Sequence, residues 1–279
     1  MTSFLEKYKR QPKIYIDLPS SGTWYDHTII HDNKCDELPV YGMNTMDELN
    51  LKTPDALFSG EATANIIKSC VPSILDPWKL LSIDVEYLLI AIRTATYGNK
   101  LPVNTVCPKC SNSTESDVNL EGLLSSFQDK TAFHVINYNG LQITIRSINY
   151  KQSTEISKNS YINQKTLANI NNSNLAEEEK DKQKQVIYKQ ITQLNYQSVL
   201  EHIDNISDGT EVENDPNKIL EFVTDCDRDF YVLLQDSIIE MNNSWNLPDL
   251  TVECAEEGCG FQYKSKLNID YSSFFAARS

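Results

Sequence analysis

The sequence contains no run of about 18 consecutive apolar residues, which is the length that a membrane-spanning helix requires. Its first ten residues, MTSFLEKYKR, also lack the apolar segment of a secretory signal. We therefore expect a product of the cytoplasm.

Basic side chains are scarce relative to acidic ones. The chain has 25 Lys and Arg residues against 39 Asp and Glu residues, which gives a formal net charge of −14. Such a charge repels nucleic-acid phosphates and anionic lipid headgroups, and no local basic patch offsets it. Nucleic acid and membranes are therefore not expected partners.

Motifs of the common catalytic sites are missing as well. The sequence has no Gly-rich phosphate loop, no Gly-x-Ser-x-Gly elbow and no His-Glu-x-x-His helix. The acidic run Glu177-Glu-Glu179 is better explained as a solvated helix start, because a helix N-terminus favours negative charge. We expect a protein that is not an enzyme and has no small-molecule substrate.

Cysteine is the residue type that carries a chemical signal. Of seven cysteines, four form two close pairs, Cys107-Pro-Lys-Cys110 and Cys254-Ala-Glu-Glu-Gly-Cys259. In a reducing compartment cysteines are mostly thiols or metal ligands. A short turn between two cysteines can place both sulfurs on one tetrahedral zinc. The spacing predicts one structural zinc per chain, held by Cys107, Cys110, Cys254 and Cys259 in two hairpin-like knuckles, as in a zinc ribbon.

The four cysteines also leave two alternatives to zinc: a redox-active Cys107-Pro-Lys-Cys110 motif, or two unrelated thiol pairs. A thioredoxin-like motif should begin a helix, whereas residues 111–117 are polar and turn-prone. A shell of four thiolates also leaves no open position on the metal for water or substrate. The zinc interpretation therefore favours a structural role.

One further group of residues and two single cysteines could also carry chemistry. His27, His31 and Cys35 are spaced four apart and would form a metal-binding face on a helix, but their neighbours favour strand or loop. We expect surface or packing histidines there. Cys70 and Cys226 follow or lie on apolar helical stripes, so we expect core thiols and not nucleophiles.

The N-terminal half predicts strands followed by helices. Residues 13–18 alternate between apolar and polar, residues 38–43 form a partner strand, and residues 45–57 are turn-rich. Short and long helices follow over residues 62–70 and 83–97. We expect the second to begin at a Ser82 cap, to stop at Gly98, and to be buried on several sides.

The C-terminal half begins with a β-hairpin around Asn139-Gly140, in residues 133–148. Residues 151–174 form either a weak helix or a mobile linker. Asn174 and Glu177 predict a capping box that opens a long helix. A single last helix is expected from the Asp215 cap through residue 234, followed by strands near residues 250–252 and 261–269.

Together these patterns predict an α+β fold. It has an N-terminal antiparallel β region, a central helical core, a β-hairpin and a split zinc-ribbon-like pair of knuckles. We divide the chain into an N-terminal β and helical region (1–104), a first knuckle with the hairpin (105–150), a helical region (151–249), and a second knuckle with the C-terminal tail (250–279).

Several motifs occur in an order that resembles a known family. They are Ile14-Tyr-Ile-Asp-Leu-Pro-Ser-Ser-Gly22, Glu37-Leu-Pro-Val-Tyr-Gly-Met43, Leu51-Lys-Thr-Pro-Asp-Ala-Leu57, Ile67-Lys-Ser-Cys-Val-Pro72, the helix from Asp84 to Gly98, and Cys107-Pro-Lys-Cys110. This run of motifs, over about residues 13–120, resembles the baseplate hub proteins of T-even-like contractile-tailed bacteriophages. The second cysteine pair and Phe274-Phe275 add weaker support, and we match no motif of this family to residues 151–213.

The resemblance implies a component or assembly factor of the central hub of a tail baseplate, whose partners are other hub proteins. It implies a location in the host cytoplasm during assembly, and in the tail baseplate if the protein stays there. Whether it stays or is released as a chaperone is left open. Two alternative functions remain, a nucleic-acid-binding zinc ribbon and a thiol oxidoreductase.

Overall fold

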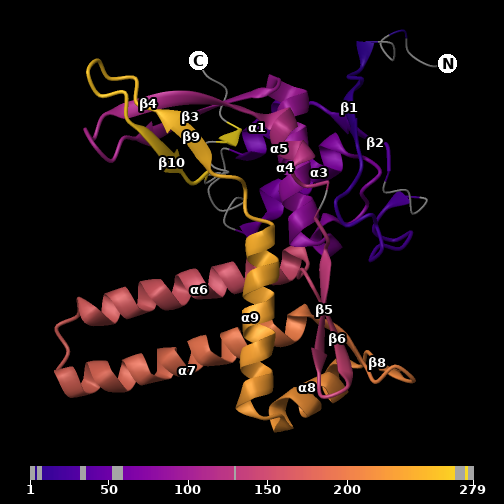
Figure 1. The fold of residues 1–279 in the computed structure, drawn as a ribbon, viewed down its shortest axis with the longest axis vertical. Helices are drawn as coiled ribbons and strands as arrows, with labels where there is room; N and C mark the ends of the chain where they lie inside the picture. Colours follow the sequence, from indigo (N-terminus) through magenta and orange to yellow (C-terminus); the bar gives the residue numbers. More distant parts are fainter. Residues whose placement is uncertain are drawn as a thin grey trace. The chain divides into compact units, whose positions relative to one another are not determined.

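The computed structural model describes residues 4, 8–31, 36–51, 59–128, 130–267 and 274–275. The chain folds as two compact units, whose elements are shown in Figure 1. Unit 1 comprises Met1–Lys130 and Trp245–Ser279, and unit 2 comprises Thr131–Ser244. Unit 2 is thus inserted between the two segments of unit 1. The four-part division made from the sequence stays a prediction.

Unit 1 combines helices with three small antiparallel sheets, each of two strands in the part of the chain that the structure describes. Its elements in chain order are β1 (Pro12–Ile16), β2 (Leu38–Tyr41), α1 (Thr45–Leu51), α3 (Glu61–Cys70), the 3-10 helix η3 (Pro77–Lys79), α4 (Ser82–Tyr97), β3 (Lys100–Val106), β4 (Ser113–Asn119), α5 (Leu120–Ser125), β9 (Leu250–Glu253) and β10 (Gln262–Ser265). The sheets pair β1 with β2, β3 with β4, and β9 with β10. Together with unit 2, this arrangement confirms the predicted α+β class.

Helix α4 forms the centre of unit 1, as its apolar sequence predicts. Residues on all its sides are buried, among them Leu88, Ile90 and Ile92. The helix ends at Gly98, which has φ 86° and whose N–H donates to the carbonyl of Thr94. The predicted Ser82 cap is wrong: Leu81 occupies the N-cap position in extended backbone, and Ser82 is already the first helical residue.

The turn-rich stretch predicted after β2 is wrong for residues 45–51, which form helix α1. Asn44 caps this helix, because its side-chain oxygen accepts hydrogen bonds from the N–H groups of Met46 (2.8 Å) and Asp47 (3.0 Å). In turn, the side-chain carboxylate of Asp47 accepts a hydrogen bond from the N–H of Asn44 at 2.8 Å. This reciprocal cap stabilises a helix that the residue composition alone does not indicate. The predicted break at Pro54 lies outside the described residues.

Unit 2 consists of a four-stranded antiparallel sheet with helices (Figure 1). Its elements are β5 (Phe133–Tyr138), β6 (Leu141–Arg146), α6 (Tyr150–Asn171), α7 (Glu177–His202), β7 (Ile203–Ser207), β8 (Val212–Glu213), α8 (Pro216–Asp225) and α9 (Arg228–Ser244). The strands are ordered β5-β6-β7-β8. Asn139 (φ 49°) and Gly140 (φ 87°) connect the first two strands, which confirms the predicted hairpin.

One face of this sheet carries the core of unit 2. Ile136, Ile143 and Ile206 are buried on it, and they pack with Phe230 and Leu234 of α9 in one apolar cluster. Residues of α7 and α8 complete the cluster. Burial of this face fixes the register of the strands, because a slip of one residue would turn the isoleucines to the opposite side.

Helices α6 and α7 lie side by side as a long hairpin (Figure 1). The sequence allowed either a helix or a linker over residues 151–174, and the structure shows a helix as far as residue 171. A capping box of Asn149 and Gln152 opens α6, with hydrogen bonds of 2.9 and 3.0 Å. The capping box predicted for Asn174 and Glu177 is wrong, because α7 begins at Glu177 behind Ala176, without a side-chain cap.

The sequence predicts a single last helix from Asp215, but the structure has two helices there, α8 and α9. Asp215 caps α8 by accepting from the N–H of Asn217 at 2.8 Å, as predicted. The chain then breaks at Cys226, and Asp227 accepts from the N–H of Phe230 at 2.9 Å. This second acceptor starts α9 as a new helix.

The described helices include none with both the length and the apolar character needed to cross a bilayer.

Candidate metal centre

The first cysteine pair lies in the turn that joins β3 to β4. The N–H of Cys107 donates to the carbonyl of Asn112 at 2.9 Å, and the N–H of Ser111 donates to the carbonyl of Cys107 at 2.9 Å. Ser111 has φ 61°, a left-handed conformation that turns the chain back toward β4. These bonds hold the loop closed with both sulfurs on one side.

The second pair lies in the turn that joins β9 to β10. The N–H of Cys254 donates to the carbonyl of Phe261 at 3.0 Å, and the N–H of Cys259 donates to the carbonyl of Glu256 at 3.0 Å. Gly258 has φ 83°, a backbone conformation that favours glycine. The two turns are therefore similar hairpin ends from distant parts of the sequence.

Polar residues attach one hairpin to the other. The hydroxyl oxygens of Thr105 and Tyr263 lie 2.8 Å apart and are buried. The N–H of Ala255 donates to the hydroxyl oxygen of Thr114 at 3.4 Å. Sequence reasoning missed these residues, because neither a threonine nor a tyrosine in a strand indicates which distant side chain it will contact.

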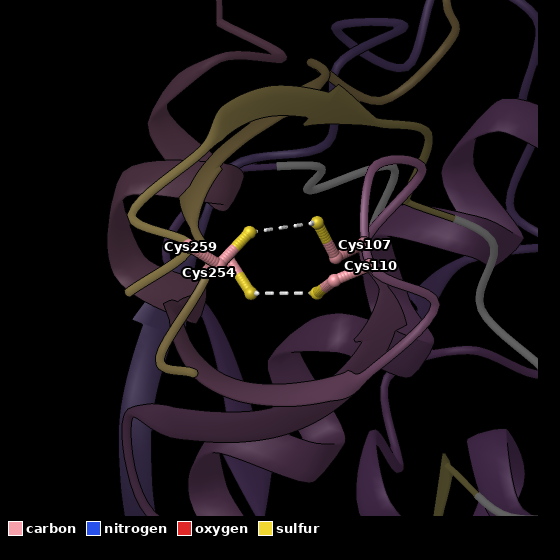
Figure 2. A group of neighbouring side chains, drawn as sticks. All are labelled: Cys107, Cys110, Cys254 and Cys259. Carbon is pink, nitrogen blue, oxygen red and sulfur yellow. Dashed lines mark hydrogen bonds between the residues drawn. The ribbon is translucent and has the colours of Figure 1, made fainter. Parts of the chain in front are cut away.

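The two hairpins bring the four predicted cysteines together (Figure 2). All four Sγ atoms lie within 4.8 Å of one another. The Sγ atoms of Cys110 and Cys254 are 3.5 Å apart, and those of Cys107 and Cys259 are 3.9 Å apart. These distances exceed the roughly 2.05 Å of a disulfide bond. They lie close to the value of about 3.8 Å that a tetrahedron with metal–sulfur bonds of about 2.3 Å gives. The cluster could therefore hold a metal ion.

The thiols differ in exposure and in proton affinity. Cys107 and Cys254 are buried, whereas Cys110 and Cys259 lie nearer the surface. Desolvation raises the pKa of Cys107, but the N–H groups of Cys110 and Lys109 and the neighbouring thiols outweigh it and bring that pKa to about 7. The N–H of Asn112 lowers the pKa of Cys110, but burial and the other three thiols raise it to about 12. Deprotonating a further thiol in the cluster is thus unfavourable, because negative charge already lies close by. A bound cation would offset this cost.

The other sequence candidates lie apart from this cluster. His27 and His31 are exposed; His27 lies in a turn and His31 directly follows the bridge residue Ile30, so no α-helix joins them. Cys35, the third residue of that group, lies outside the described residues. Cys70 is buried, and desolvation raises its pKa to about 12, as expected of a core thiol. Cys226 is half-buried at the end of α8, where desolvation and two flanking aspartates raise its pKa.

The acidic run at the start of α7 is exposed, as predicted. Glu177 accepts from Lys180 at 3.0 Å, and Glu178 accepts from Lys182 at 3.2 Å. Both pairs follow helical spacing at the surface, where such ion pairs contribute little to stability. In the part of the chain that the structure describes, the four cysteines form the one group with metal-ligand geometry.

The fold and the site define a mixed α+β protein with a four-thiol cluster shared by two hairpins. Residues 41–276 match the family described as T4 bacteriophage base plate protein. The chain belongs to this family, and it is therefore a phage baseplate protein, associated with the virion tail and with other baseplate proteins. Neither a curated protein nor a solved structure matches it.

Proposed function

We propose that the chain is a component or assembly factor of the central hub of the contractile-tail baseplate, and that it acts through contacts with other hub proteins. The family match over residues 41–276 is the observation that carries this proposal. The motifs between residues 13 and 120, which resemble hub proteins, favour the hub over other parts of the baseplate. The protein would work in the host cytoplasm during assembly.

We propose further that Cys107, Cys110, Cys254 and Cys259 hold one structural zinc. Four thiolates are a common ligand set for tetrahedral zinc, and the Sγ separations of 3.5 and 3.9 Å agree with that geometry. Zinc would fasten the segment before unit 2 to the segment after it. Since four protein ligands would complete the shell, the metal would have no position for water or substrate.

Metal content tests the zinc proposal directly. Elemental mass analysis of the purified full chain should find one zinc per chain, and the Cys107→Ser/Cys254→Ser variant should lose it. Cys226→Ser is the matched control, since Cys226 lies outside the cluster, and it should keep the zinc. Iron in place of zinc would refute the choice of metal, and absence of any metal from the wild type would reopen the thiol-redox alternative.

We propose no catalytic role for the protein. The cluster supports this view, because a saturated four-thiolate metal acts as a structural link and not as a Lewis acid toward substrate. A thiol oxidoreductase would instead reduce a disulfide substrate and would lose that activity in the Cys107→Ser variant. Turnover of this kind by the wild type would contradict the proposal.

Co-purification tests the hub assignment. The tagged full chain, produced together with the tail proteins of its own phage, should retain hub proteins and not the proteins of the outer baseplate. Retention of outer baseplate proteins alone would leave the family assignment intact and refute the hub role. Mass spectrometry of mature tails beside assembly intermediates then separates a resident component from a released chaperone.

A further inference from the structure

A depression with a volume of about 270 Å³ opens in unit 2 between helix α8 and the ends of strands β6, β7 and β8. Apolar side chains line most of it: Leu141, Ile206, Val212, Ile219 and Phe222. Ile206 and Ile219 form its buried part, whereas Val212 is 65% and Phe222 is 36% exposed. The depression therefore offers an apolar floor with two accessible side chains at its opening.

Carboxylates surround this opening. Asp208, Glu211 and Glu213 lie on it together with one cation, Lys218. Glu213 and Lys218 pair at 2.6 Å, so their charges largely cancel toward a ligand. The N–H of Glu211 and the N–H and hydroxyl of Thr210 hold the pKa of Asp208 down at about 2, which keeps this carboxylate ionised at neutral pH. The opening is thus negative because of Asp208 and Glu211.

The turn that carries these acids is well ordered by its own hydrogen bonds. The hydroxyl of Ser207 donates to the carbonyl of Glu211 at 2.8 Å. One oxygen of Asp208 accepts from the N–H groups of Thr210 and Glu211, both at 2.8 Å. The acidic side of the depression is therefore largely formed before any ligand arrives, which lowers the entropy cost of binding.

The size and surroundings favour a protein segment as the occupant. Pockets for drug-sized molecules usually measure roughly 300–1,000 Å³, and this smaller one fits a single large side chain. β8 ends the strand order of the sheet and is only two residues long. An extended chain can lie along such an edge. We propose that the depression binds an extended segment of a partner protein that presents one Leu-like or Phe-like side chain flanked by Arg or Lys.

This proposal stands on unit 2 alone and depends neither on the metal nor on the hub assignment. The amidated pentapeptide Gly-Arg-Leu-Arg-Gly is a suitable probe, with Gly-Glu-Leu-Glu-Gly as its charge-reversed twin. Titrated into the full chain labelled for nuclear magnetic resonance, the first peptide should shift the amide signals of Glu211, Val212 and Lys218 saturably. The twin should bind more weakly, and added salt should reduce the difference.

Two variants separate a specific site from general attraction. Val212→Arg places a long cation at an exposed position of the opening. It should lower the affinity for the Arg-flanked peptide by at least about tenfold. Glu211→Lys should reverse the preference between the two peptides. Leu220→Ala is the matched control: Leu220 lies on the same helix, is 42% exposed and does not line the depression, so binding should not change.

Three outcomes would overturn the proposal. The first is no saturable shift in the wild type with either peptide. The second is equal affinity in the wild type and in Val212→Arg. The third is a concentration-dependent dimer that Val212→Arg abolishes, because it would assign the depression to a second copy of the chain instead of a partner.

Discussion

Asp84 gives a pH dependence that can be worked out from its surroundings. Its carboxyl group is fully buried at the start of α4. It accepts hydrogen bonds from the N–H of Ser20 at 3.1 Å, from the Ser20 hydroxyl at 2.5 Å, and from the Tyr25 hydroxyl. Burial raises its pKa from 3.8 to about 6, and the hydrogen bonds from Ser20 and Tyr25 offset this rise only in part. The folded chain therefore binds this proton more tightly than the unfolded chain.

The sign of the effect follows from this difference. The contribution of Asp84 to stability is fully present below about pH 4, where its carboxyl group is protonated, and is lost as the pH rises through the folded pKa of about 6. The full shift corresponds to roughly 3 kcal/mol, of which about 2 kcal/mol falls between about pH 4.5 and pH 7. Asp84→Asn keeps the shape of the side chain and removes the titration.

Urea unfolding of the wild type and of Asp84→Asn at both pH values measures the effect. Other carboxylates titrate in both proteins, so they cancel in the difference between the two free energies of unfolding. Between about pH 4.5 and pH 7 that difference should change by about 2 kcal/mol, because the wild type loses stability relative to Asp84→Asn as the pH rises. Asp249→Asn, which removes an exposed carboxylate of the same unit, should show no such change. A wild-type-to-variant difference that is constant with pH would refute the reasoning.

Four further outcomes are expected, each measured by thermal or urea unfolding. Removing the proposed metal with a chelator should lower Tm by on the order of 10 °C, because a site absent from the unfolded chain stabilises only the folded one. Gly98→Ala should destabilise by about 1–3 kcal/mol, since Gly98 has φ 86° and ψ −173°, whereas Gly122→Ala, inside helix α5, should not. Phe274→Ala should cost about 3–5 kcal/mol because Phe274 is only 3% exposed and its ring contacts that of Phe275. Asp215→Ala should cost about 1 kcal/mol through loss of the α8 cap.

Local signals explain what could be predicted from the sequence. Asn139-Gly140 specifies its own turn, and the two cysteine pairs lie on turns short enough for each pair to approach one metal. The apolar run of α4 predicted its burial for a similar reason, because a surface helix is not apolar on every side. Each of these features depends on residues close together in the chain.

Apart from the Asp215 cap of α8, features that depend on single polar caps were missed or misplaced. Asn44 and Asn149 start α1 and α6 in stretches of weak helical pattern, and Asp227 divides a continuous apolar stripe into α8 and α9. Asn174 has the sequence of a cap but does not act as one. A side chain of this type can cap a helix or support a turn, and tertiary packing decides between the two.

Long-range partners account for what the sequence could not predict. Asp84 lies near a helix start, where an exposed acid would be ordinary, but Ser20 and Tyr25 cover it from 64 and 59 residues away. The approach of the two cysteine pairs was predictable, because a four-coordinate metal would draw two thiols from each pair. The Thr105–Tyr263 contact that supports it was not, since a threonine and a tyrosine carry no comparable demand for each other.

Unit 2 is inserted in the sequence between the two segments of unit 1, and this explains how a metal at the four cysteines would stabilise the fold. The chain leaves unit 1 at Lys130 and returns at Trp245, where the Lys130 ammonium lies 5.0 Å from the ring centre of Phe127 and 5.7 Å from that of Trp245. Cys110 and Cys254 are 144 residues apart and enclose the same insertion. A cross-link over about 100 residues removes unfolded-state entropy worth roughly 5 kcal/mol. A metal at the four cysteines would thus stabilise unit 1 by linking its two segments, while the partner surface that we propose in unit 2 remains independent of it.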